Sequence, residues 1–260
     1  MPIFFLTWSA GPKPVHHQAF GPIRTLIIDA GHGGKDPGSV GKLVYEKDIT
    51  IKVAKKLQQM VNEKMPGVRA VLTRKDDTFI PLHERGKIAQ REGGDFFISI
   101  HCNGMKYADR HGTETYVLGT NEGQENYERI IQENQSILFE ENYLTEYDGF
   151  DPNSPEANIF FSLVNNAFRS ESFRLADGIQ HQYEHSFHRF NRGVKQAPFV
   201  VLYMCGMPAV LTEIGFITNP EEEIYLQSEE GQSNIASALF NAVKTYNQGL
   251  KTDKSTPGND

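Results

Sequence analysis

The segment from Arg24 to Asp48 constrains the fold more than any other part of the chain. It begins with a continuous, β-branched apolar run, Thr25 to Ile28, which predicts a buried strand because turn residues follow it. His32 comes next among three glycines, which allow a sharp turn and leave room for an imidazole. Glu46 follows, just before a helical pattern. A histidine after a strand and a carboxylate at the next helix start both lie where open α/β sheets bind ligands, and together they suggest a metal.

The rest of the chain continues the pattern of strands and helices. Residues 96–100 form an apolar run that ends at His101, which repeats the arrangement at His32, and a last buried strand at 209–212 ends at Glu213. Two further strands are expected, at 69–73 and 113–118, and a strand and turn within 194–204. Three helices are expected, at 47–64, from Pro81 to the glycines at 93 and 94, and at 233–246. The chain from 124 to about 188 is expected to be mostly polar helix, broken at 147–156.

His32, Glu46 and His101 are therefore three candidate metal ligands at corresponding places. Taken singly, each also has a structural interpretation as a turn histidine, a helix-start carboxylate and a packed core histidine. Two imidazoles and one carboxylate form a ligand set of catalytic zinc hydrolases, which leave the fourth position to water. Zinc lowers the pKa of that water to about 7 and can polarise a scissile carbonyl. Glu213, on the same sheet edge, is the candidate general base and acid.

Composition limits the function classes. A net charge of −7 argues against non-specific nucleic-acid binding, and two cysteines, Cys102 and Cys205, are too few for a disulfide framework. Whether these two cysteines pair stays open at this point. Residues 1–22 contain a short apolar run consistent with a secretory signal remnant, although no basic residue precedes it. After it, no apolar run is long enough to span a membrane.

Several segments together resemble one known family, the zinc-dependent N-acetylmuramoyl-L-alanine amidases. The similarity covers roughly residues 23–248, and residues 249–260 form a polar tail. The segments occur in the order and spacing of that family, and they are IIDAGHGGKDPG, Glu46, TRKDDTFIPLHERGKIA, DFFISIHCNG, NRGVKQAPFVVL and PAVLTEIGFITNPEEE.

The resemblance implies a fold, an activity and a set of site residues. The implied fold is a three-layer αβα sandwich with a mixed, mainly parallel sheet of about six strands and a helical insertion. The implied activity is hydrolysis of the amide between the lactyl group of N-acetylmuramic acid and L-alanine in peptidoglycan. By the family motifs, one zinc ion would be bound by His32, Glu46 and His101, with Glu213 as the catalytic residue. Arg85 and Asn103 occupy motif positions of supporting residues.

The middle of the chain departs from the compact members of the family. Residues 120–167 are extra, and they resemble the regulatory insertion of Gram-negative-type amidases, in which a glutamate covers the open zinc position. Glu140 or Glu141 is the expected autoinhibitory residue. The resemblance further implies a periplasmic or secreted enzyme of cell-wall remodelling or daughter-cell separation, and an envelope activator protein that displaces the insertion.

Alternatives within the sequence are weaker. His181, His185 and His188 share one predicted helix, but Gln182 replaces the glutamate of the zinc-protease signature, so a solvated face is expected. Cys102 should point to the strand face opposite His101 and pack in the core. A non-catalytic wall-binding scaffold would not need the general base. A zinc exopeptidase would need a richer carboxylate set for two metals.

Overall fold

The computed structural model describes residues 21–105, 109–120, 124–140 and 168–253. Within them, six strands form one sheet in the order β2-β1-β3-β6-β4-β5. Among the described residues, no helix has both the length and the apolar character to cross a membrane. The strands are β1 (Thr25–Ala30), β2 (Arg69–Leu72), β3 (Phe96–Asn103), β4 (Thr113–Leu118), β5 (Asn191–Ala197) and β6 (Ala209–Phe216).

The sheet is mixed and mainly parallel, as the family resemblance implies. β1 pairs in parallel with β2 and β3, and β3 pairs in parallel with β6. β4 is antiparallel to β6 and parallel to β5, so the last two strands run opposite to the other four. Every residue of β3 and β6 is buried, because a parallel sheet with helices on both faces excludes water from both sides of its central strands.

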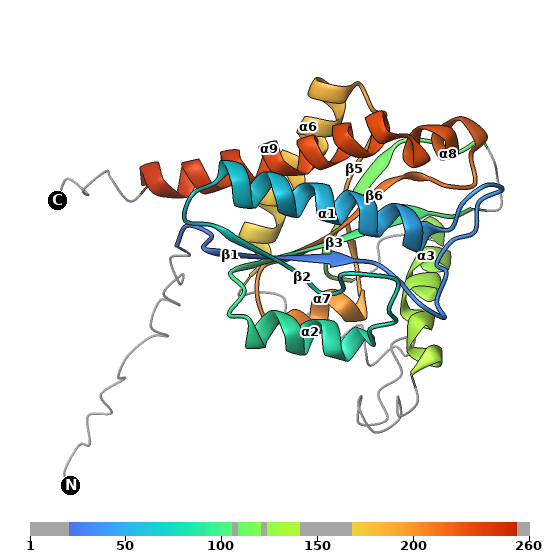
Figure 1. Cartoon of the computed structure of the whole chain (residues 1–260), viewed down its shortest axis with the longest axis horizontal. Coiled ribbons are helices and arrows are strands. Elements are labelled where there is room, and N and C mark those ends of the chain that lie inside the picture. The colour runs from blue at the N-terminus through green and yellow to red at the C-terminus, as the bar shows by residue number, and fades with distance from the viewer. Residues whose placement is uncertain (1–20, 106–108, 121–123, 141–167, 254–260) are drawn as a thin grey trace, which may run out of the picture.

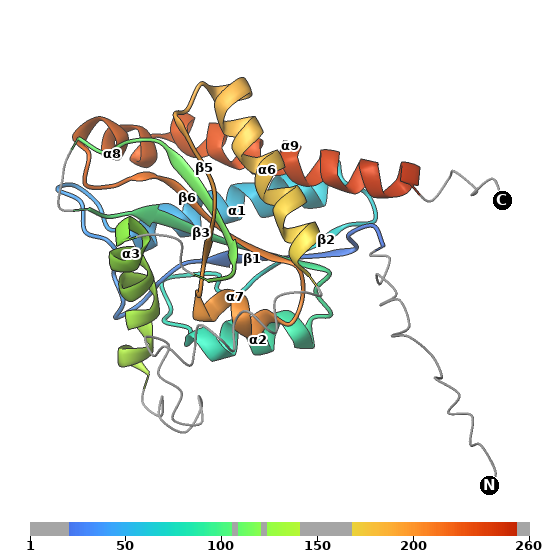
Figure 2. The same ribbon diagram turned by 180° about the vertical axis from the view of Figure 1, so that it is seen from behind.

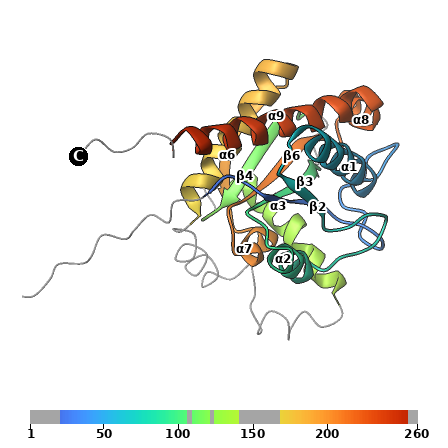
Figure 3. The same cartoon turned by 60° about the vertical axis from the view of Figure 1, so that its left-hand side comes forward.

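Helices cover both faces of the sheet and complete the three-layer sandwich (Figures 1 and 3). One core includes apolar side chains of α1, α6 and α9, and the other includes side chains of α2 and α7. The helices are α1 (Glu46–Lys64), α2 (Leu82–Arg91), α3 (Gln124–Asn134), the 3-10 helix η1 (Gln135–Phe139), α6 (Arg169–Phe187), α7 (Val200–Cys205), α8 (Pro220–Gln227) and α9 (Glu229–Asp253).

Two elements differ from the sequence expectations. The run at residues 200–205 was expected as strand and turn but forms α7, because a short apolar run does not distinguish a buried helix from a strand. Four of these six side chains are buried, and the helix ends at Gly206, whose φ of 66° suits glycine. Helix α9 continues into the predicted tail as far as Asp253, because Leu250 is still buried in the core.

The described part of the segment expected as an insertion, residues 120–167, includes α3 and η1. Figures 1 and 2 show α3 at the end of the sheet toward which the β1 arrow points. The opposite end of the molecule holds both ends of the described chain. There the backbone N–H of Ile23 donates to Asn247 Oδ1 at 2.7 Å, and Asn247 Nδ2 lies 3.4 Å from Ile23 O.

Candidate metal centre

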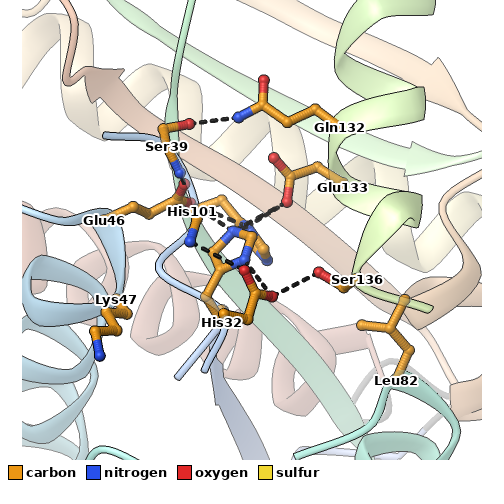
Figure 4. Close-up of polar contacts among 12 residues, drawn as sticks. His32, Ser39, Glu46, Lys47, Leu82, His101, Gln132, Glu133 and Ser136 are labelled. Carbon is orange, nitrogen blue, oxygen red and sulfur yellow. Dashed lines mark hydrogen bonds and ion pairs between the residues drawn. The ribbon is translucent and has the colours of Figure 1, made fainter. Parts of the chain in front are cut away.

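Four buried side chains converge at the carboxyl ends of β1 and β3 (Figure 4). They are His32, Glu46 and His101, which the sequence pattern singles out, together with Glu133 of α3. One donor atom of each lies within 4.8 Å of the others. His32 Nε2 lies 3.2 Å from both Glu46 Oε1 and His101 Nδ1, and the last two atoms are 3.1 Å apart. Side chains from a turn, a helix start, a strand and the insertion thus meet at one place.

The turn after β1 holds His32 in an uncommon conformation. Its φ is 61°, a left-handed backbone that residues other than glycine rarely adopt and that is found more often at functional sites. His32 Nδ1 lies 2.9 Å from Asp36 Oδ2, so in the neutral imidazole Nδ1–H donates to Asp36 and Nε2 offers a lone pair. A Cβ at Gly38 would overlap the His32 ring, so the turn requires glycine there.

Glu46, the first residue of α1, is fixed by backbone amides from two other segments. Its Oε2 accepts from the Ser39 N–H at 2.7 Å, and its Oε1 accepts from the Cys102 N–H at 2.7 Å. Burial acts to raise the pKa of Glu46, but the neighbouring imidazoles of His32 and His101 hold that pKa well below its ordinary value. The carboxylate is therefore ionised and held in one orientation.

Glu133 approaches the group from the opposite side. Its Oε2 lies 2.8 Å from His101 Nδ1 and 3.2 Å from His32 Nε2. Although it is buried, this oxygen forms no hydrogen bond with any described residue. A buried carboxylate oxygen without a donor is costly, and a metal ion would satisfy it.

The donor set and its spacing fit zinc. Tetrahedral zinc with bonds of about 2.0–2.1 Å separates neighbouring donor atoms by about 3.3 Å, and five donor pairs here lie 2.8 to 3.2 Å apart. The site also requires positive charge. Burial acts to lower the pKa of His101, but Glu133 and Glu46 raise it to about 10. A divalent cation would supply the same charge.

Glu213 lies beside this group on β6, where it is the paired residue of His101 in the β3–β6 register. It is fully buried, and neither of its carboxylate oxygens forms a hydrogen bond within the described part of the chain. Burial raises the pKa of Glu213 well above its ordinary value, against the opposing effect of Arg129, whose Nε is 3.8 Å from Glu213 Oε1. A carboxyl group with a raised pKa can both accept and return a proton near neutral pH.

Arg129, on the same helix as Glu133, also contacts a second buried carboxylate, Glu114 of β4. Arg129 Nη1 lies 3.0 Å from Glu114 Oε2, and Arg192 Nε of β5 lies 2.9 Å from Glu114 Oε1. Lys195 pairs with the same carboxylate. Burial acts to raise the pKa of Glu114, but Arg129 and Lys195 lower it to about 2.

The two expected supporting residues lie outside the metal-facing group, which consists of His32, Glu46, His101 and Glu133. Arg85 is buried, and its guanidinium donates to Asp29 Oδ1 at 2.8 Å and to the carbonyl of His32 at 2.9 Å. Asn103, at the end of β3, has its Nδ2 3.4 Å from Glu114 Oε1. Arg85 thus supports the turn that contains His32, and Asn103 contacts the Glu114 cluster.

The expected autoinhibitory glutamate requires a correction. Glu140 Oε1 accepts from the Leu82 N–H at 2.8 Å, and Glu140 Oε2 lies 2.7 Å from His83 Nδ1. These contacts hold Glu140 at the start of α2, and the glutamate beside the metal-facing histidines is Glu133. Glu141 lies outside the described residues. The one sequence signal for Glu133 is its i, i+4 spacing from Arg129, which places two opposite charges on one helix face.

The rival ligands do not join the group. His181 and His185 of α6 and His188, which follows the helix, are exposed, and the rings of His181 and His185 stack with centroids 4.2 Å apart. Cys102 is buried in the core that includes α1 and α9 side chains. Both cysteines are free, which settles the question that the sequence left open.

Comparison with known proteins places this geometry in a family. The family model described as N-acetylmuramoyl-L-alanine amidase matches residues 26–245. An uncharacterised protein of Bacillus subtilis, YqiI, is 34% identical over 231 residues and covers 88% of each chain. The N-acetylmuramoyl-L-alanine amidase AmiA of Escherichia coli is 32% identical over 242 residues, which is 93% of this chain and 82% of AmiA.

Solved structures agree with the sequence relatives. An N-acetylmuramoyl-L-alanine amidase from Clostridium difficile 630 superposes with a TM-score of 0.64 at 27% identity and covers 91% of this chain and 100% of its own. The amidase AmiC2 of Nostoc punctiforme gives a TM-score of 0.62 at 28% identity, over 86% of this chain and 97% of AmiC2. Because the family model spans nearly the whole described chain, this protein belongs to the N-acetylmuramoyl-L-alanine amidase family.

Proposed function

We propose that this amidase uses one zinc ion to hydrolyse the amide between the lactyl group of N-acetylmuramic acid and the L-alanine of the peptidoglycan stem peptide. The family match over residues 26–245 supports the choice of bond. The main support for zinc is the convergence of His32 Nε2, Glu46 Oε1 and His101 Nδ1 beside a buried Glu133 oxygen that forms no hydrogen bond with the part of the chain that the structure describes.

In this proposal each residue has one role. His32, Glu46 and His101 hold the metal, and the bound zinc supplies Lewis-acid activation of water and of the scissile carbonyl. Glu213 moves the proton: its carboxylate accepts it from the attacking water and returns it to the departing amine of L-alanine. Among the described residues neither Glu213 oxygen forms a hydrogen bond, which supports this role because both oxygens remain available to the reactants.

We further propose that α3 holds the enzyme in an inhibited state. Glu133 would take the position that a catalytic zinc site keeps for water, while Arg129 faces the general base Glu213. Two more contacts support a closed state: Gln132 Nε2 donates to Ser39 Oγ at 2.6 Å, and Ser136 donates to Asp36 at 2.7 Å. Figure 4 shows Glu133, Gln132 and Ser136 reaching the site from the same side.

The proposed location and the proposed partner follow from the substrate and from the inhibition by α3. Peptidoglycan lies outside the cytoplasm, so the enzyme would act in the periplasm or after secretion, in cell-wall remodelling or daughter-cell separation. An envelope protein that displaces α3 would act as the activator. The division of the chain into a catalytic region, residues 23–248, with an insertion at about 120–167 belongs to this proposal.

The test measures soluble material released from purified peptidoglycan. Glu133→Ala is compared with the intact chain and with Glu128→Ala, a matched control because Glu128 is an exposed glutamate of the same helix. We expect Glu133→Ala to be at least about tenfold faster, which corresponds to about 1.4 kcal/mol of lost closed-state stability, and Glu128→Ala to equal the intact chain.

Two further arms separate the parts of the proposal. Glu133→Ala combined with Glu213→Gln should lose about 10²- to 10⁴-fold in rate while still binding one zinc. Chelation should stop release, and added zinc should restore it. Equal rates for the Glu133 and Glu128 variants would contradict inhibition by α3, persistent activity in the double variant would contradict the role of Glu213, and insensitivity to chelation would contradict zinc.

A further inference from the structure

Two buried polar side chains, Ser99 and Asp29, are linked by a hydrogen bond on the side of His101 away from the metal-facing group. His101 Nε2 lies 3.1 Å from Ser99 Oγ, and the Ser99 hydroxyl donates to Asp29 Oδ2 at 2.7 Å. Both Ser99 and Asp29 are fully buried. The sheet builds this arrangement, because Asp29 and Ser99 are paired residues of β1 and β3. Ser99 precedes His101 by two residues, so their side chains share one face of β3.

The direction of the hydrogen bonds follows from the chemistry of Asp29. Its Oδ1 accepts from Thr73 Oγ1 at 2.6 Å and from Arg85 Nη1 at 2.8 Å. A carboxylate paired with a guanidinium is ionised and can only accept. Ser99 has one hydroxyl proton, which it gives to Asp29, so its oxygen must accept from His101 Nε2–H. The neutral imidazole therefore has its lone pair on Nδ1, the atom that faces the other metal-facing donors.

The two histidines of the site are thus oriented through opposite nitrogens. His32 contacts the carboxylate of Asp36 directly through Nδ1 and faces the group with Nε2. His101 reaches a carboxylate only through a serine hydroxyl, and it faces the group with Nδ1. A Cβ at Gly31 would overlap the His101 ring, so the ring is packed directly against the backbone and has little room to turn.

We propose that Asp29 and Ser99 form a hydroxyl relay that fixes the tautomer of His101 and so presents Nδ1 to the metal. Both are positioning residues, since neither belongs to the metal-facing group. The inference rests on the zinc site of the proposed function. It is independent of whether α3 inhibits the enzyme.

The first test measures the zinc affinity of the full chain by competition with a chromophoric chelator. Ser99→Ala removes the relay, and we expect zinc to bind about 10- to 100-fold more weakly, as for other residues that orient a metal ligand. Thr73→Val is the matched control: it removes a different hydroxyl donor from Asp29, keeps a similar shape and leaves Ser99 and His101 untouched. It should bind zinc as the wild type does.

The second test is spectroscopic and concerns the proton itself. In zinc-loaded protein with ¹⁵N-labelled histidine, His101 Nε2–H should give a resonance protected from exchange in the wild type and in Thr73→Val. Ser99→Ala should lose this protection. Asp29→Asn can donate its amide to Ser99, which would turn the hydroxyl proton toward His101 Nε2 and favour the wrong tautomer. We expect zinc affinity in Asp29→Asn to fall at least as far as in Ser99→Ala.

The outcomes separate the relay from the proposed function. Wild-type affinity together with an unchanged Nε2–H resonance in Ser99→Ala would overturn the relay and leave the amidase proposal standing. A wild-type chain that binds no zinc would overturn the zinc site, and the relay with it. Thermal unfolding shows whether Ser99→Ala folds. If it does not, zinc affinity and the His101 Nε2–H resonance are compared between Asp29→Asn and Thr73→Val instead.

Discussion

The two sides of the metal-facing group are held in different ways. On the sheet side, Glu46 accepts from two buried backbone amides, while His32 and His101 are each held from behind by a polar side chain. These partners come from the turn after β1 and from β3, and β3 pairs with both β1 and β6 in the centre of the sheet. Moving any of the three side chains would leave buried donors or acceptors without partners.

On the α3 side, Glu133 Oε2 has no hydrogen bond within the described residues, and polar side chains such as Gln132 of α3 and Ser136 of η1 attach this segment to the site. Each such hydrogen bond contributes about 0.5–1.5 kcal/mol, and water or another protein can replace it. The apolar anchors Ile130 and Ile137 are buried, but Leu138 and Phe139 are exposed. In the proposed inhibited state, the sheet side would be the preorganised part of the site and the α3 side the part that detaches.

The largest effect is expected on the sheet side, at Glu46. Glu46→Gln keeps the size of the side chain but turns an NH₂ group toward the backbone amides of Ser39 or Cys102, where it cannot accept. We expect zinc affinity to fall by more than about 100-fold, beyond the effect of a residue that only orients a ligand, and amidase activity to fall to background. Zinc content after dialysis measures this. A variant that still holds one zinc per chain would show that Glu46 is not a zinc ligand.

The pH dependence of stability tests the contact between α3 and Glu114 of β4. The pKa of Glu114 is lowered to about 2 in the folded protein, below its ordinary 4.5. Its contribution to stability is therefore complete above about pH 4.5 and is lost as the pH falls toward 2. The full contribution is on the order of 3 kcal/mol. Urea unfolding at pH 5 and pH 3 should show a smaller loss for Glu114→Gln than for the wild type. Equal losses would show that Glu114 is not responsible.

A smaller effect on rate is expected at Arg129. Arg129→Met keeps most of the packing volume and removes the charge that faces Glu114 and Glu213. If α3 detaches, the closed state should lose about 1 kcal/mol, and peptidoglycan release should rise about fivefold with unchanged zinc affinity. Unchanged release, with the variant folded, would mean that Arg129 does not hold the helix closed.

The smallest effect is expected at Ser136. Ser136→Ala removes the hydrogen bond to Asp36, and we expect the free energy of unfolding to fall by about 0.5–1.5 kcal/mol. Leu138→Ala is the control, because Leu138 is 66% exposed on the same 3-10 helix and its change should stay within about 0.5 kcal/mol. Denaturant titration compares the two. A larger loss for Leu138 would mean that η1 packs against something else in solution.

The sheet side of the site could be predicted from the sequence because its signals are local. His32, His101 and Glu213 each follow an apolar run, and Glu46 begins a helical pattern. Parallel strands end at one edge of a sheet, so these patterns alone bring the side chains together. The αβα sandwich was implied by the family resemblance, and the six-stranded sheet with helices on both faces confirms it (Figure 3).

The α3 side could not be predicted in the same way, because its contacts depend on how one helix docks. Glu133 and Glu140 are both acidic residues of the segment expected as an insertion, and only packing places Glu133 at the histidines and Glu140 at the start of α2. The Asp29–Ser99 contact also escaped the sequence, since it depends on the register between β1 and β3. The resemblance to the family drew attention to this segment but not to Glu133, the residue that enters the site.

The reciprocal contact between Ile23 and Asn247 bears on the topology of the chain. It joins the segment before β1 to the last turns of α9, so the first and last described elements lie next to each other. Chain ends that lie together at one side of a domain are suited to circular permutation. A permuted protein in which a short linker connects residue 253 to residue 21, and new ends open at the turn at Gly67, should keep the same strand order.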